Sequence, residues 1–167
     1  MDDPDPAGNI ILQLLLLLVL ILVNAFFAMS EIAVISLNDN KIQKMAEEGH
    51  KKAKQILRLT ENSSNFLSTI QIGVTLAGFL TSASASQTFA DKLATAIAQP
   101  KVVAVIPYSV ISGFAMVVIT LIMSYFSLVL GELVPKKIAM QKPEKVSFLA
   151  VGPLLFAVSY THLRAHE

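Results

Sequence analysis

The sequence predicts an all-α membrane protein with three transmembrane helices and further juxtamembrane helices on the cytosolic side. Of the 167 residues, 54% are hydrophobic and only 15% are charged, whereas about a quarter of a soluble domain is charged. The chain also contains apolar runs of about 18 residues or more, which is the length that an α-helix needs to cross a bilayer. These observations exclude an ordinary soluble domain.

Composition excludes several classes of function as well. A net charge of +1 gives no electrostatic reason to expect nucleic acid as a partner. The chain has no cysteine, so disulfides and thiolate metal sites are absent. His50 lies in a charged segment and His162 and His166 lie near the end of the chain, which counts against an intramembrane zinc or copper site. An intramembrane hydrolase that used Glu31 and Glu132 would need a nucleophile–base pair or a metal with an open position, and no histidine lies in the spans, so we expect no enzyme.

The chain begins with an acidic segment and one long apolar helix. Residues 1–9 contain aspartates and prolines but no lysine or arginine, so we interpret them as an exposed, extracellular N-terminus rather than a signal peptide. The first predicted span covers about residues 10–37, with Ser30 and Glu31 inside its apolar sequence.

A charged juxtamembrane segment, residues 38–65, follows. Its apolar residues Ile42, Met45, Ile56 and Leu59 fit short amphipathic helices broken at Gly49. It carries six basic residues, whereas the N-terminus carries none. The positive-inside rule therefore predicts the N-terminus outside and the C-terminus cytoplasmic, and we expect the protein in the plasma (inner) membrane.

The remaining elements are two spans and a second juxtamembrane segment. The spans cover about residues 66–89 and 102–134, and the juxtamembrane segment covers 136–158. Its apolar part, residues 146–158, is too short to cross and is interrupted at Gly152-Pro153. Residues 159–167 continue no pattern, and we predict that they are a non-native tail.

Polar stripes run along the spans. Asn24 and Glu31 share one face of the first helix, and small or hydroxylated residues recur at helical spacing in the other two. These residues are Gln71, Thr75, Gly78 and Ser82 in the second span, and Ser109, Gly113, Thr120, Ser124, Ser127 and Gly131 in the third. Close helix packing explains such stripes, but it does not explain the carboxylates.

The sequence around Pro135 suggests a site for a hard cation. Proline cannot donate to the carbonyl four residues earlier, so within a helix it leaves the Gly131 carbonyl free beside Glu132. The inferred topology places Glu31, Gln71 and Glu132 near the cytosolic side, and oxygen ligands at one depth suit such a cation. The alternative is that Glu132 forms an interfacial ion pair with Lys136.

Three motifs in this order resemble the transmembrane domain of the CorC/CNNM family, whose bacterial members are called hemolysin-like. They are Phe27-x-x-Ser30-Glu31-x-Ala33, Phe66-Leu67-Ser68-Thr69-Ile70-Gln71-Ile72-Gly73, and Gly131-Glu132-x-x-Pro135-Lys136, within a resemblance that covers residues 10–158. It implies a homodimer in the lipid bilayer that transports Mg2+, with exchange for Na+ as a further implication. It also implies cytosolic CBS domains that are missing here, so the chain resembles a C-terminally truncated member.

Carried over by motif, the candidate metal ligands are Ser30, Glu31, Ser68, Gln71, Gly131 and Glu132. The sequence departs from the family at Val74 and Gly78, where many members carry asparagine, so the contribution of the second helix and the selectivity for Mg2+ are open. We predict transport or efflux of a divalent cation. The alternative is a membrane anchor that holds cytosolic regulatory domains without transporting an ion.

Overall fold

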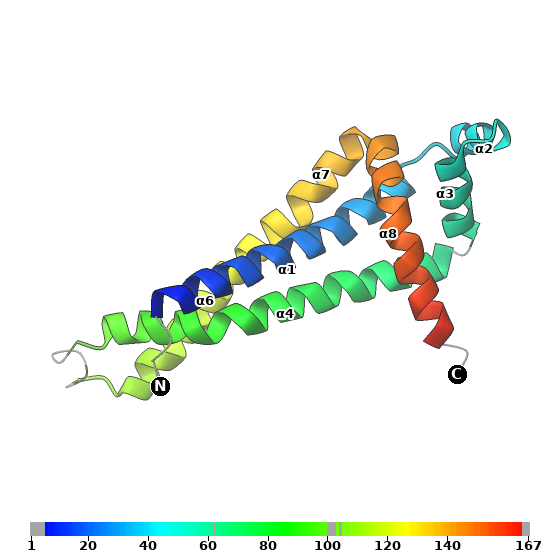
Figure 1. Cartoon of the computed structure of the whole chain (residues 1–167). Coiled ribbons are helices and arrows are strands. Elements are labelled where there is room, and N and C mark those ends of the chain that lie inside the picture. The colour runs from blue at the N-terminus through cyan, green and yellow to red at the C-terminus, as the bar shows by residue number, and fades with distance from the viewer. Residues whose placement is uncertain (1–5, 62, 100–102, 104, 165–167) are drawn as a thin grey trace.

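The computed structural model describes residues 6–61, 63–99, 103 and 105–164, and over these residues its elements are helices, as predicted (Figure 1). Parts of the predicted N-terminus and tail, the start of the third span at residue 102, and His166 lie outside them. The elements are α1 (Pro6–Ile35), α2 (Asp39–Glu47), α3 (Lys51–Glu61), α4 (Ser63–Ile97), α6 (Tyr108–Leu128), the π-helical turn η1 (Val129–Leu133), α7 (Val134–Gln141) and α8 (Pro143–Arg164).

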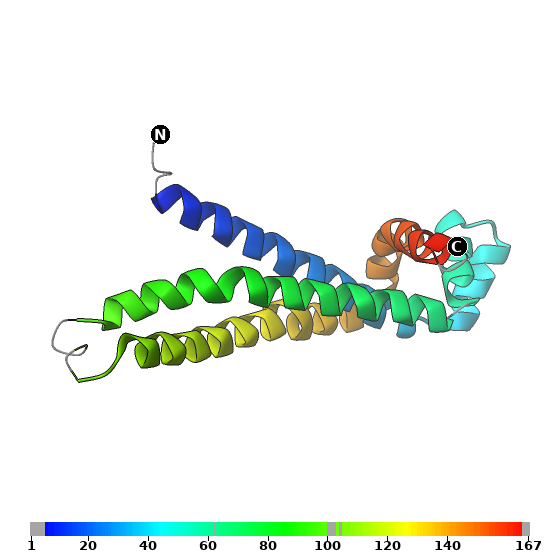
Figure 2. The ribbon, with the colours of Figure 1, turned by 90° about the horizontal axis from the view of Figure 1, so that it is seen from below.

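Three long rods form the body of the molecule. The first is α1, the second is α4, and the third is the continuous run of α6, η1 and α7 (Figure 1). α4 packs against both α1 and α6, and the final part of α1 packs against η1 and α7. Figure 2 shows α4 and α6 side by side, with α1 diverging from them toward its N-terminus. The final part of α1 therefore lies beside η1 and α7, and the candidate site lies along this contact.

Two segments of the described chain are long and apolar enough to cross a membrane. They are Ile10–Ile35, with 26 residues, and Tyr108–Gln141, with 34 residues. α4 is longer, at 35 residues, but its many small and hydroxylated residues make it less apolar. The structure thus supports two of the three predicted spans, and the span at 66–89 stays a prediction. The third rod also extends beyond the predicted end at residue 134, because the helix continues through Pro135.

The α8 end of the bundle, where α1 finishes, α4 begins and α2, α3 and α8 gather, contains the main hydrophobic core. Ile42 of α2 and Ile56 and Leu59 of α3 are buried there against Phe66 of α4 and Leu154 of α8. The predicted break between α2 and α3 is observed at Gly49, whose φ of 94° is a left-handed conformation that favours glycine. The amphipathic helices predicted for residues 38–65 are confirmed.

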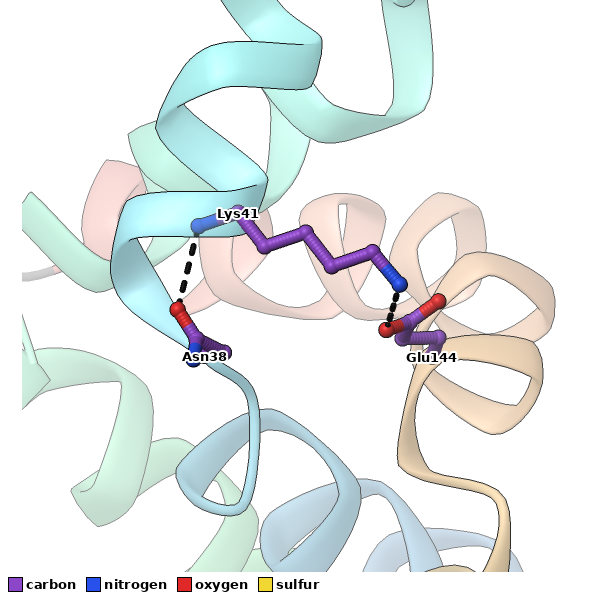
Figure 3. Close-up of polar contacts among 3 residues, drawn as sticks. All are labelled: Asn38, Lys41 and Glu144. Carbon is purple, nitrogen blue, oxygen red and sulfur yellow. Dashed lines mark hydrogen bonds and ion pairs between the residues drawn. The ribbon is translucent and has the colours of Figure 1, made fainter.

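Polar contacts also attach the α2–α3 pair to α8. The Asn38 side chain accepts a hydrogen bond from the Lys41 N–H and so caps α2. The Lys41 ammonium lies 2.5 Å from Glu144 on α8 (Figure 3). His50 stacks on Phe148, with 5.0 Å between ring centres. The juxtamembrane helices are therefore held to one another across more than a hundred residues of sequence.

α8 differs from the predicted segment, because the expected interruption at Gly152-Pro153 is not seen. One helix runs from Pro143 to Arg164 and includes Pro153. Gly152 and Pro153 lie on its exposed side, whereas Val151 and Leu154 are buried. The proline removes one backbone donor, and the packing of the opposite face keeps the helix intact. The helix also continues past residue 158, where the sequence pattern was expected to stop.

Candidate functional site

The third rod contains a π-helical turn directly before its proline. Within η1 the Val134 N–H donates to the Val129 carbonyl, five residues earlier. Pro135 has no N–H, so it can donate neither to Gly131, its α-helical partner, nor to Leu130, its π-helical partner. Such turns are frequent at functional sites, because they disturb the regular pairing of backbone groups inside a helix. The predicted placement of Pro135 inside a helix is confirmed.

Gly131 brings the π-helical turn into close contact with α1. A Cβ atom at this position would lie only 2.7 Å from Nδ2 of Asn24, which is closer than real side chains approach. Gly131 itself is buried. A larger residue here would displace the Asn24 side chain, so glycine permits this close contact between η1 and α1.

Asn24 is a buried polar residue with an unused acceptor. Its side chain is 4% exposed, and its Oδ1 atom has no hydrogen-bond donor among the described residues. Leaving such a group unpaired costs about 1–3 kcal/mol, so native structures supply a partner in most cases. An amide oxygen in this state is a suitable ligand for a hard cation or for a water molecule bound to one.

Asn24 lines a groove of about 320 Å³ between the three rods. The groove brings together part of each polar stripe of the second and third spans, because Thr75, Gly78 and Ser82 of α4 line it together with Ser124 and Ser127 of α6. Glu132 of η1 lines it too, as do Val74, Phe79 and Leu128. The groove thus combines hydroxyl groups, an amide and one carboxylate.

Glu132 also belongs to a cluster of three charged side chains. Its Oε1 lies 2.7 Å from the Lys136 ammonium, and Oε2 of Glu31 lies 3.5 Å from the same nitrogen. The side chains of Glu31, Glu132 and Lys136 are 23%, 32% and 28% exposed, so each is largely withdrawn from solvent. Ser30 beside them is fully buried, and its hydroxyl donates to the Phe26 carbonyl over 2.6 Å. Its oxygen lone pairs remain able to accept.

The structure brings some of the predicted ligands together and leaves others apart. Glu31 and Glu132 both form ion pairs with Lys136, and Gly131, next to Glu132 in the chain, packs against Asn24 of α1. Ser68 and Gln71 are exposed and are not among the residues that line the groove. Across the described ranges, no three histidine, cysteine or acidic residues are grouped so as to hold a metal ion. A cation here would therefore depend on neutral oxygens in addition to the carboxylates.

The ion pair between Glu132 and Lys136, which the sequence left as an alternative, is present and extends to Glu31. That extension was hidden from the sequence, because no basic residue lies within four positions of Glu31. Sequence reasoning also missed Asn24, Ser124 and Ser127 as candidate ligands. An asparagine inside an apolar span was the available signal, since polar residues within a membrane are rare and often functional.

Comparison with known proteins identifies the family of the chain. The family model described as the cyclin M transmembrane N-terminal domain matches residues 15–161. The chain is 36% identical to the UPF0053 protein sll0260 of Synechocystis over 92% of its own length, and 33% identical to the UPF0053 protein YhdP of Bacillus subtilis over 87%. It spans about a third of the length of these relatives, 33% and 32% respectively.

A shorter similarity links the chain to a protein with a named substrate. The polyamine export protein of Escherichia coli is 37% identical over 68 residues, which is 41% of this chain and 15% of that protein.

Proposed function

Because the chain belongs to the cyclin M transmembrane N-terminal domain (CNNM) family, we propose that it is the membrane domain of a transporter for a hard divalent cation, with Mg2+ as its substrate. The family match confirms the resemblance that the three sequence motifs indicated. Two apolar helices and the family together identify an integral membrane protein.

The observation that carries the proposal is the unpaired Asn24 oxygen in a groove that contains the Glu132 carboxylate. Mg2+ takes about six oxygen ligands near 2.0–2.1 Å and gives up its water reluctantly. The groove offers the Asn24 amide, the Ser124 and Ser127 hydroxyls and one carboxylate, and its volume of about 320 Å³ leaves room for retained water. Neutral oxygens beside a single acid suit an ion that must bind and then leave.

In this proposal the groove lies between three transmembrane helices. α4 would be the second span, because it packs between the other two rods and supplies their polar lining. The basic residues of the α2–α3 region favour a cytosolic α8 end, with the N-terminus outside. We expect a homodimer and Na+ as a coupling ion, as the family resemblance implies. It also implies cytosolic CBS domains, and the relatives, about three times as long, have length enough for such domains.

A polyamine is the second candidate substrate. It is favoured by the similarity to the polyamine export protein and by a groove that combines hydrogen-bond acceptors with a carboxylate. An organic cation needs no octahedral set of oxygens, so its transport would depend on Glu132 but less on Asn24.

Flux through reconstituted vesicles tests the proposed function. Purified chain in liposomes that contain a Mg2+-sensitive dye should transport Mg2+, and Glu132→Gln should abolish the signal. Glu144→Gln is the matched control, since it removes the same charge from an exposed pair on α8, away from the groove. If vesicles containing the wild-type chain show no more flux than empty vesicles, the membrane-anchor alternative holds. Flux of spermidine without flux of Mg2+ would identify the polyamine substrate.

A further inference from the structure

The Lys136 ammonium lies between the two acidic groups of the site. The three charged side chains come from three elements, because Glu31 lies in α1, Glu132 in η1 and Lys136 in α7. Among the described residues, Lys136 is the one basic residue that forms an ion pair with Glu31 or Glu132. The resulting cluster has two negative charges and one positive charge.

From this arrangement we propose that Lys136 is a tethered counter-ion that competes with the transported ion and makes the site select divalent over monovalent cations. This inference rests on the proposed function. The Oε1 atom of Glu132 accepts from the ammonium at 2.7 Å, so it is not fully available to a metal ion while that contact persists. An arriving cation and the ammonium also repel one another across the same carboxylates.

The charge of the arriving ion decides the outcome of this competition. A monovalent cation that displaces the ammonium from Glu132 exchanges one positive charge for another, so it gains little. A divalent cation brings twice the charge to the Glu132 carboxylate and can keep part of its water in the groove, so its attraction outweighs the loss of the ammonium contact. At this groove Lys136 therefore favours Mg2+ over Na+, so a coupling Na+ would bind elsewhere in the protein.

The Lys136 ammonium can move away from the carboxylates when an ion binds, and its return is favourable when the ion leaves. The Lys136 side chain is 28% exposed on a flexible four-carbon stem, so its head group can turn toward solvent without leaving the helix. When the ion leaves the groove, two partly buried carboxylates would otherwise remain unpaired, which is unfavourable. Return of Lys136 removes that penalty and so assists release.

Calorimetric Mg2+ titration of four proteins tests the inference: wild type, Lys136→Met, Lys136→Arg and Lys137→Met. Methionine keeps the length of the side chain and removes its charge. Lys137 is exposed and adjacent, so Lys137→Met controls for the loss of one positive charge. We expect Lys136→Met to bind Mg2+ on the order of three- to thirty-fold more tightly, the range set by loss of one or two partly exposed ion pairs. Lys136→Arg and Lys137→Met should remain close to wild type.

Competition by Na+ gives a second readout that a merely structural role would not change. Replacing an organic cation salt with Na+ at about 0.1 M, where screening is the same, should weaken Mg2+ binding by Lys136→Met and leave wild type nearly unaffected. Equal affinities in Lys136→Met and Lys137→Met would overturn the inference, and weaker binding by Lys136→Met would show that the lysine positions the carboxylates. Absence of Mg2+ binding in wild type and every variant would instead refute the proposed function.

Discussion

Replacing Gly131 by alanine tests the packing that builds the site. The added methyl group would lie 2.7 Å from Nδ2 of Asn24, a buried residue whose side chain would have to shift to admit it. Inserting a methyl group into such a contact costs about 1–3 kcal/mol. We therefore expect Gly131→Ala to lower the free energy of unfolding and to shift Asn24 within the groove.

Gly78 provides a matched control for this substitution. It lines the same groove, but a Cβ atom there would meet nothing within 4 Å. Both substitutions gain the advantage of alanine over glycine in a helix, about 0.5–1 kcal/mol, so this gain cancels when they are compared. Gly131→Ala should thus be less stable than Gly78→Ala by about 1–3 kcal/mol.

Unfolding in detergent micelles, followed by far-ultraviolet circular dichroism, measures this difference. Repeating both substitutions in an Asn24→Ala background completes a double-mutant cycle, because the shortened side chain removes the obstacle. The penalty at Gly131 should then largely disappear. Equal stability of Gly131→Ala and Gly78→Ala, or an undiminished penalty in the Asn24→Ala background, would refute the close contact between η1 and α1.

Two other predictions concern helix packing. Gly73→Ala should lower the free energy of unfolding by about 1–3 kcal/mol, because the added Cβ atom would lie 2.9 Å from the Phe27 ring. A Phe27→Ala background should relieve this loss. Unchanged stability of Gly73→Ala would contradict the contact. Gly113→Leu should leave the unfolding of a single chain unchanged, because nothing lies within 4 Å, but should weaken the proposed dimer as measured by cross-linking in lipid. A chain that stays monomeric at every concentration in lipid would exclude that dimer.

Local rules predicted much of the helical structure from the sequence. The break between α2 and α3 was predictable because Gly49 separates two amphipathic patterns, and their apolar residues are indeed buried. The stripes on the second and third spans also indicated which faces meet, since Thr75, Ser82 and Ser124 line one groove. These features depend on the spacing of polar and apolar residues along each helix, which can be read from the sequence alone.

Other features depend on contacts between distant residues. The link between Glu31 and Lys136 requires α1 to lie beside α7, which the spacing within either helix does not indicate. Pro153 was expected to interrupt α8, but burial of Leu154 on the opposite face outweighs the lost backbone donor. The π-helical turn was likewise not predictable from the sequence, because its packing depends on the contact of Gly131 with Asn24 of a different helix.

Calorimetric titration of Mg2+ into wild type, Asn24→Leu and Glu132→Gln tests the central claim, that the groove is a cation site. Leucine has the branched shape of asparagine but lacks its unpaired oxygen, and glutamine removes the charge of Glu132 while keeping its shape. Loss of even an outer-shell partner lowers metal affinity about 10–100-fold, so each variant should bind Mg2+ at least about tenfold more weakly than wild type. Circular dichroism should show all three proteins folded. Unchanged Mg2+ affinity in both folded variants would contradict the claim.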